Sequence, residues 1–159
     1  MKIRHSLLTI TSILLLTGCT NASNEMATVV EEVSTDFPPK MAGLVNIEGE
    51  IYEMEEGNSR WERKKGAETE TVLTDAPSPS KLAEDFPAIA LEPSTNIVIE
   101  IEGNPKQRVY LWTEEDRDKD IVLENNQFTA PSSKGRYTYE VLANWKNGEV
   151  SYTFVVEVD

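Results

Sequence analysis

The chain of 159 residues contains one histidine and one cysteine. The histidine, His5, lies in a segment that we predict below to be removed, so the mature chain would have no imidazole. This absence excludes serine or cysteine nucleophiles activated by histidine, histidine general bases and histidine-ligated zinc. A Gly-x-Ser-x-Gly motif and a phosphate-binding glycine loop are also missing. We therefore expect no enzyme activity and no cofactor, although a site made of paired carboxylates or a lysine base would need none of these groups.

Basic residues are scarce relative to acidic ones. The chain has 15 lysines and arginines and 28 aspartates and glutamates, which gives a formal net charge of −13. Without the first 18 residues, which contain Lys2 and Arg4, the net charge is −15. A surface this negative repels phosphate backbones, which excludes nucleic acid as a partner. With 39% hydrophobic and 27% charged residues, the composition is that of one globular domain with a core.

The first nineteen residues have the layout of a secretory signal peptide. Lys2 and Arg4 precede an apolar run from Leu7 to Leu16, which is shorter than the roughly 20 residues of a bilayer-spanning helix. The run ends in Leu16-Thr17-Gly18-Cys19, which resembles the lipobox of bacterial lipoprotein precursors. The resemblance implies that residues 1–18 are a cleaved signal peptide and that Cys19 is acylated and becomes the N-terminus. The alternative is an uncleaved anchor or an ordinary signal peptide followed by an incidental cysteine.

Cys19 is the only thiol, so an exported protein of this sequence forms no intramolecular disulfide. Two or three acyl chains, at about 0.8 kcal/mol per buried methylene, would hold it firmly on a membrane. Residues 19–42 are rich in Asn, Ser, Thr and Glu and contain Phe37-Pro38-Pro39 near their end, which predicts a flexible acidic tether with a reach of about 25 Å. Met26 to Val33 alternatively forms a short strand or a helical turn within it.

Residues 43–159 are predicted to be the folded domain, and the clearest element is a hairpin formed by Tyr137 to Asp159. Apolar residues alternate on both sides of Asn147-Gly148, the kind of dipeptide that most strongly favours a two-residue hairpin turn. All the large apolar side chains of the hairpin then share one face, since side chains alternate along a strand. With that turn, the facing pairs are Trp145–Val150, Ala143–Tyr152, Val141–Phe154, Tyr139–Val156 and Tyr137–Val158.

Alternating patterns between turn signals predict further elements. In chain order, we expect a strand over residues 45–51, a strand containing Trp61 after the turn Gly57-Asn58, a strand over 69–74, a helix over 80–85 capped by Ser78 and Pro79, and strands over 97–101, 108–113 and 127–130. Both faces of residues 108–113 are apolar, which indicates a central strand. Turn signals about 8 to 12 residues apart are typical of an all-β sandwich.

Gly135-Arg136-Tyr137-Thr138-Tyr139 resembles the start of strand F in immunoglobulin-like domains, where a tyrosine corner hydrogen-bonds back to the backbone. Trp112 stands where these domains often keep a core tryptophan, and the absence of a disulfide makes the resemblance one to cysteine-free members. Val109 to Trp112 together with Gly135 to Val158 also resembles the C-terminal part of small lipoproteins of Gram-positive, Bacillus-type bacteria. The resemblance implies an all-β, immunoglobulin-like antiparallel β-sandwich with one short helix at the cell membrane. It carries no functional residue onto this chain.

Two groups of residues are candidates for binding. Asp116, Asp118 and Asp120 alternate in an acidic run and offer the oxygen ligands that calcium prefers. The run lacks the glycine and the final glutamate of a calcium loop, so a solvated hairpin tip is the favoured interpretation. Trp61 lies among charged residues and would contact a carbohydrate or protein partner if exposed, whereas strand alternation slightly favours a core position. Trp112 and Trp145 are expected in the core.

The sequence thus predicts a non-enzymatic, lipid-anchored β-sandwich that acts as an interaction or ligand-binding module outside the plasma membrane. The expected partners are the membrane, through the lipid on Cys19, and an extracytoplasmic protein or small ligand that the sequence does not identify. The alternative function is weak calcium binding or sensing by the acidic loops. A third is an enzyme accessory domain with a paired-carboxylate site.

Overall fold

The structure, a computed structural model, describes residues 36–113 and 116–159. These residues belong to one compact unit, Ser34–Asp159. The predicted signal peptide, Cys19 and the predicted tether up to residue 35 lie outside the described residues.

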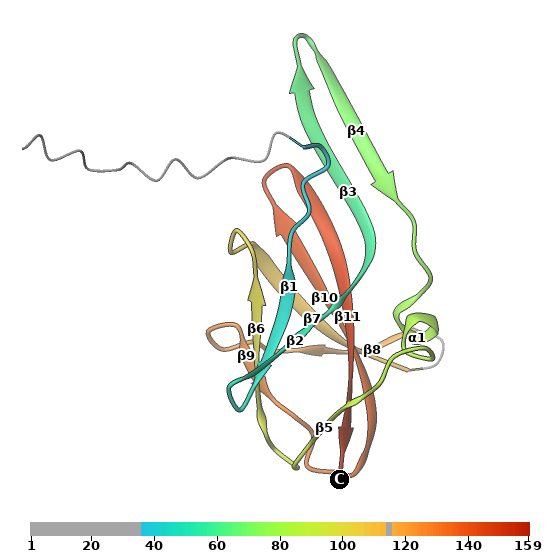
Figure 1. The fold of residues 1–159 in the computed structure, drawn as a ribbon, viewed down its shortest axis with the longest axis vertical. Helices are drawn as coiled ribbons and strands as arrows, with labels where there is room; N and C mark the ends of the chain where they lie inside the picture. The colour runs from blue at the N-terminus through green and yellow to red at the C-terminus, as the bar shows by residue number, and fades with distance from the viewer. Residues whose placement is uncertain (1–35, 114–115) are drawn as a thin grey trace, which may run out of the picture. The chain divides into compact units, whose positions relative to one another are not determined.

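Nearly all regular structure in this unit is β-strand, as predicted (Figure 1). The described helix is α1 (Pro79–Leu82), and it begins where expected, because the Ser78 hydroxyl caps it by accepting a hydrogen bond from the Lys81 backbone N–H at 3.4 Å. The strands are β1 (Gly43–Ile47), β2 (Glu50–Glu53), β3 (Glu55–Lys65), β4 (Glu68–Thr74), β5 (Ile89–Leu91), β6 (Asn96–Ile101), β7 (Lys106–Trp112), β8 (Arg117–Ile121), β9 (Gln127–Thr129), β10 (Gly135–Trp145) and β11 (Gly148–Val158).

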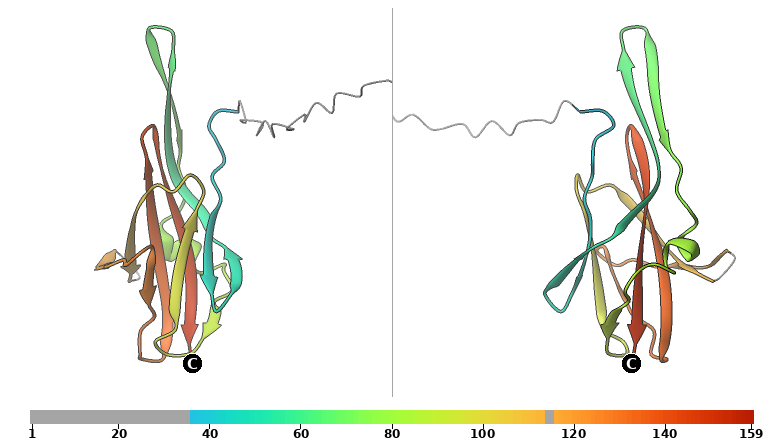
Figure 2. Two further views of the ribbon diagram at one scale, coloured as in Figure 1. Left: turned by 90° about the vertical axis from the view of Figure 1, so that its left-hand side faces the viewer. Right: turned by 45° about the vertical axis from the view of Figure 1, so that its right-hand side comes forward.

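The strands form two sheets that pack face to face (Figure 1; Figure 2). Sheet A has the order β2-β1-β6-β9, and sheet B has the order β4-β3-β11-β10-β7-β8, with β5 parallel to the end of β11. The order β11-β10-β7-β8 matches strands G, F, C and C′ of variable-type immunoglobulin domains, and β1-β6-β9 matches strands A, B and E. The fold is therefore an all-β sandwich, as predicted, and it is extended at its edges by β2 and by the β3–β4 hairpin.

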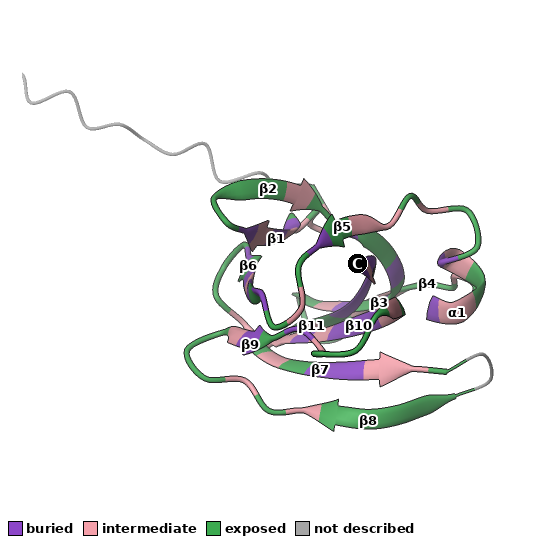
Figure 3. Cartoon of the chain, turned by 90° about the horizontal axis from the view of Figure 1, so that it is seen from below, coloured by how far each residue is buried: buried purple, intermediate pink, exposed green. Residues whose placement is uncertain are grey.

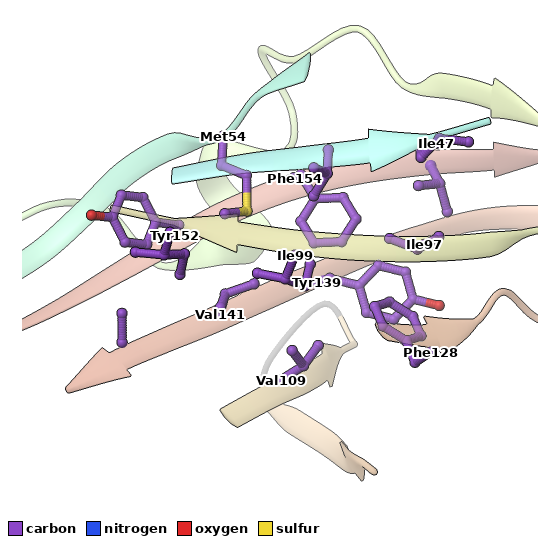
Figure 4. Packing of buried hydrophobic residues seen from close by; sticks show 14 of the residues in the cluster. Ile47, Met54, Ile97, Ile99, Val109, Phe128, Tyr139, Val141, Tyr152 and Phe154 are labelled. Carbon is purple, nitrogen blue, oxygen red and sulfur yellow. The ribbon is translucent and has the colours of Figure 1, made fainter. Parts of the chain in front are cut away.

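The core lies between the two sheets and contains three packed aromatic rings (Figure 4). Tyr139 stacks on Phe154 with ring centroids 5.2 Å apart, and Phe128 of sheet A approaches Tyr139 at 5.0 Å. The β-branched side chains that fill the space around these rings are Val45, Ile97, Ile99, Val109, Val141, Val150 and Val156. Seen from below in Figure 3, exposed residues run along β2 and β8 at the margins of the sheets.

The predicted pairing of the closing hairpin is wrong by two residues. In the structure, Tyr139 lies opposite Phe154 and Val141 lies opposite Tyr152, with the turn at residues 146–147. The faces are nevertheless as predicted, because a shift of two residues returns each side chain to the same side of the sheet. The large apolar side chains of the hairpin accordingly point into the core.

Gly148 lies outside the turn and makes room for an indole ring. It pairs with Trp145 on one side and with Trp61 of β3 on the other. A Cβ atom on Gly148 would lie 2.0 Å from Cε3 of Trp61. Trp61 is 2% exposed and packs against Trp145 with ring centroids 5.1 Å apart. The candidate surface tryptophan is therefore a core residue, and Trp61 is not available to a partner.

Two other turn assignments change. Gly57-Asn58 lies inside β3, where a Cβ atom on the glycine would lie 2.6 Å from the Ser151 Oγ. The predicted strand 45–51 is divided by a turn at Glu48 and Gly49, which both have positive φ, and becomes the β1–β2 hairpin. Two further turns, at Gly103-Asn104 and at Asn125-Asn126, have positive φ at both positions.

The residues that lead into β10 form the predicted tyrosine corner. The Tyr137 hydroxyl donates a hydrogen bond to the backbone carbonyl of Ser133 at 2.9 Å. Gly135 has a φ of 150°, a conformation that other residues rarely adopt, so glycine is required where the loop enters the strand. The corner fixes the start of the strand that lies beside β11 in the middle of sheet B.

The folded unit begins earlier than predicted. The backbone carbonyl of Met41 accepts a hydrogen bond from the Tyr152 hydroxyl at 2.7 Å. The Arg63 guanidinium lies over the Phe37 ring, 4.3 Å from its centroid. The last residues of the predicted tether, 19–42, are therefore part of the folded unit, because they supply partners that the sandwich uses.

The two buried tyrosines of the hairpin predict a loss of stability in alkali. Burial raises the pKa of the Tyr139 and Tyr152 hydroxyls above the ordinary value of about 10. The folded state therefore holds these protons more tightly than the unfolded chain does, so their contribution to stability is complete below about pH 10 and declines as the pH rises further. In an ultraviolet titration, we expect both phenols to ionise only as the protein unfolds. Ionisation of all five tyrosines with a native circular dichroism spectrum would contradict this.

Candidate functional site

The acidic residues predicted as calcium ligands do not converge. Asp118 and Asp120 lie on β8, an exposed edge strand of sheet B, and not at a hairpin tip. The Asp116 carboxylate accepts a hydrogen bond from the Arg117 backbone N–H at 2.7 Å. Within residues 36–113 and 116–159, no three acidic, histidine or cysteine side chains are close enough to hold a metal ion together. Asp116, Asp118 and Asp120 thus form no metal site with other described residues.

One carboxylate of sheet B is buried, and both of its oxygens are hydrogen-bonded within the sheet. Glu140 on β10 is 4% exposed. Arg117 Nε and Trp112 Nε1 each donate to Oε2 at 2.7 Å, and Arg117 Nη2 donates to Oε1 at 3.0 Å. This bidentate pair holds β8 against β7 and β10. Glu140 therefore has a structural role. Both of its carboxylate oxygens already accept hydrogen bonds, so neither is free to bind a substrate.

Trp112 lies on the outer face of sheet B, so its predicted core position is wrong. It pairs with Thr138 and therefore faces the same side as Glu140. The core side of β7 is occupied by Val109 and its alternating neighbours, which leaves the indole to cover the buried ion pair. Trp145, in contrast, packs against the core cluster as predicted.

One spacing overlooked in the sequence is Ser78-Pro79-Ser80-Lys81, which has the Ser-x-x-Lys pattern of some acyl-transfer enzymes. A lysine that acts as a base needs a lowered pKa. Here the Lys81 ammonium donates a hydrogen bond to the Glu84 carboxylate, which raises the Lys81 pKa. The Ser78 hydroxyl is used as the cap of α1. Ser78 in this Ser-x-x-Lys pattern therefore caps the N-terminus of α1 and is not an activated nucleophile.

A strand edge of sheet A is left open near the end of β6. β9 pairs only with Asn96–Val98 of β6, and the Asn126 carbonyl accepts a hydrogen bond from the Ile99 N–H at 2.8 Å. Beyond Ile99, no described strand pairs with that edge, although the other edge of β6 is paired with β1 along its length. An open strand edge presents backbone groups that can hydrogen-bond to another chain.

Gln107 on β7 lines a groove beside this open edge, which we call the Gln107 groove. The groove has a volume of about 600 Å³, and Leu44, Val98 and Glu100 on the outer face of sheet A also line it. Gln107 pairs with Ala143, whose side chain faces the core, so its amide points inward. Both polar atoms of that amide are shielded from solvent, and neither has a hydrogen-bond partner among the described residues.

The unpartnered amide of Gln107 is an energetic cost that a bound group would remove. A buried polar group without its hydrogen bonds costs roughly 1 to 3 kcal/mol, and native proteins keep few of them. Its carbonyl accepts and its NH2 group donates, which is the complement of a peptide group. The only other such atom in the part of the chain described is the Thr153 hydroxyl, a single group that one water molecule would satisfy. The Gln107 groove thus combines a donor, an acceptor and an open strand edge.

Comparisons with protein-family models, with curated proteins and with solved structures found no match to this chain. In the described ranges, no helix is long and apolar enough to cross a membrane. Support for a binding site therefore comes from the geometry of the Gln107 groove.

Proposed function

We propose that the protein is a non-enzymatic, extracytoplasmic lipoprotein whose sandwich binds an extended polypeptide segment in the Gln107 groove. The anchor is supported by Leu16-Thr17-Gly18-Cys19 at the end of a signal-peptide pattern. The absence of histidine after His5 supports a role without catalysis. The binding role depends on one observation: the shielded, unpartnered amide of Gln107 lies in a cavity beside an open strand edge.

A bound segment would extend sheet A by adding a strand to β6. In an antiparallel ladder, alternate residues direct their backbone groups to opposite edges. The Glu102 N–H donates to the Ala42 carbonyl on the β1 side at 3.0 Å, so the N–H of Ile101 points to the groove side. The bound segment would accept a hydrogen bond from the Ile101 N–H. If the Gln107 side chain turns toward the groove, its amide would form reciprocal hydrogen bonds with a peptide group of the segment.

The carboxylates along the groove favour a segment with basic side chains. Val98 and Glu100 alternate along β6 and share the outer face of sheet A. Glu102, directly after β6, lines the groove together with them. An added strand would place every second side chain beside them. Lysine or arginine at those positions would contribute about 0.2 to 1 kcal/mol each, and acidic side chains there would be repelled.

Gln107→Leu is expected to change binding and stability in opposite directions. Leucine is close to glutamine in size and removes the unpartnered amide, so the free energy of unfolding should rise by about 1 kcal/mol. The probe acetyl-Lys-Ser-Lys-Ser-amide should bind the wild-type protein saturably and the variant not at all. Heteronuclear NMR would follow the Ile101 N–H and the Gln107 side-chain amide, and urea denaturation would measure stability.

Two controls separate the groove from a general attraction of charges. The probe acetyl-Glu-Ser-Glu-Ser-amide should not bind. Gln127→Leu removes a glutamine whose amide oxygen already accepts a hydrogen bond from Asn96 at 2.8 Å, so it should leave binding of the lysine probe unchanged. If Gln107→Leu lowers stability and no probe binding saturates, the amide is a hydrated part of the core and the groove is not a binding site.

A further inference from the structure

The β3–β4 hairpin projects beyond the sandwich as an arm (Figure 1; Figure 2). β3 pairs with β11 as far as Trp61, which lies opposite Gly148. Beyond that pair, residues 62–65 form ladder pairs only with residues 68–71 of β4. Four residues at about 3.3 Å each carry the arm roughly 13 Å past the last pair with β11. The tip of the arm is therefore free of the sandwich.

The N-terminal segment joins the folded unit at this arm. Phe37 lies under the Arg63 guanidinium of β3, and Met41 lies so near the β6–β7 turn that a Cβ atom on Gly103 would be 3.1 Å from its Cε. The C-terminus lies at the opposite end of the sandwich (Figure 1). The arm, the entering chain and two strand turns thus share one end, which we call the tether end and define as residues 36–42, 60–71, 102–107 and 144–149.

The tether end differs in charge from the rest of the folded unit. It carries seven basic and six acidic side chains, whereas the remainder of residues 36–159 carries six basic and nineteen acidic ones. Arg63 in the arm pairs with Glu70 at 2.7 Å. Within the described ranges, Lys64 and Lys65 at the tip form no ion pair. The tether end thus has a net charge of +1, against −13 for the remainder, so the acidic protein is least negative at the place where the chain from Cys19 arrives.

We propose that the tether end faces the membrane and that Lys64 and Lys65 contact anionic lipid headgroups. This inference rests on the lipid anchor at Cys19 that we propose above. Seventeen residues separate Cys19 from Phe37, and the flexible tether predicted from the sequence would have a root-mean-square span of about 20 to 25 Å over that length. The arm reaches past the sandwich at the end where this segment enters, so the tip comes within reach of the headgroups.

An anionic surface acts on both parts of the charge distribution. It attracts basic side chains that lie within roughly 10 Å, the screening length in physiological salt. It repels the acidic remainder of the folded unit, which would face the membrane if the sandwich turned over. The lipid supplies the affinity, and the charges select the orientation.

Lysine acetylation followed by mass spectrometry tests this orientation. The mature chain is coupled through Cys19, its only thiol, to a maleimide phospholipid and placed on vesicles of phosphatidylglycerol and phosphatidylcholine or of phosphatidylcholine alone. We expect the acetylation rates of Lys64 and Lys65 to fall about threefold or more on the anionic vesicles and to recover in high salt. Lys134, in the loop before β10, should react equally on both and is the internal control.

Charge-reversal variants give a second measurement. In the wild-type chain on anionic vesicles, Lys146 should also be acetylated more slowly, because it lies in the β10–β11 turn of the tether end. Lys64→Glu combined with Lys65→Glu should remove this protection of Lys146. Lys119→Glu combined with Lys134→Glu makes the same charge change elsewhere and should preserve it. Equal acetylation of tip and control lysines on anionic vesicles would overturn the proposal, as would equal protection on neutral ones. Because the lipid is attached chemically, these outcomes do not depend on acylation in the cell.

Discussion

Phe154→Ala is expected to lower the free energy of unfolding by about 3 to 5 kcal/mol, the range for removing a large aromatic side chain from a core. Phe154 is 4% exposed and stacks on Tyr139 with ring centroids 5.2 Å apart. Its strand, β11, pairs with β3, β5 and β10. The cavity left by the ring is bordered by strands that cannot move closer without breaking these ladders, so relaxation recovers little of the loss.

Urea denaturation of the mature chain would measure this loss from the midpoint and the slope of the transition. Val122→Ala is the matched control, because it also shortens an apolar side chain but at a position that is 82% exposed. It should change the free energy of unfolding by less than about 0.5 kcal/mol. A loss below roughly 1 kcal/mol for Phe154→Ala would show that the apolar face of the hairpin is not buried in solution.

The faces of this hairpin follow from its sequence, whereas its pairing does not. Alternation with a period of two assigns Tyr139 and Phe154 to the core for any shift by an even number of residues. Asn147-Gly148 favours a turn locally, and that preference is overridden here. The Trp61 indole leaves no room for a side chain at position 148. Because Trp61 belongs to a distant strand, no local pattern reports this contact.

Glycine serves two purposes that a single sequence does not distinguish. At Gly49 and Gly103 it permits a positive φ in a turn. At Gly57 and Gly148 it permits a close approach between β3 and β11 inside a sheet. The turn predicted at Gly57-Asn58 is wrong for this reason. Whether a glycine forms a turn or permits a close contact depends on which strand lies beside it in the fold.

The Gln107 groove has no signal in the sequence, because its residues become a site only through the way strands pair. Gln107 belongs to no motif, and its amide matters because β9 stops pairing partway along β6. The acidic run before Ile121 has the composition of a solvated loop, and the residue that holds part of it in a strand is distant in the sequence. Arg117 becomes part of a strand once Glu140 on β10 supplies its partner.

Cys19→Ala is expected to abolish membrane retention and to leave the fold unchanged. The lone thiol is the point of acylation implied by the lipobox-like sequence. Two or three acyl chains, at about 0.8 kcal/mol per buried methylene, supply far more binding free energy than the surface charges of one protein face. Because Cys19 precedes the folded unit in the sequence, the free energy of unfolding should not change.

Metabolic labelling with a fatty acid and membrane fractionation would test this expectation, with Thr20→Ala as a matched control that keeps the thiol. We expect the control to be labelled and to sediment with membranes, and Cys19→Ala to lose both properties. A variant that loses the label but sediments at full length would show that residues 1–18 are an uncleaved anchor. Equal labelling of both proteins would place the acyl chains elsewhere. If Cys19→Ala loses both the fatty-acid label and its retention on membranes, the lipid on Cys19 is what links the sandwich to the membrane.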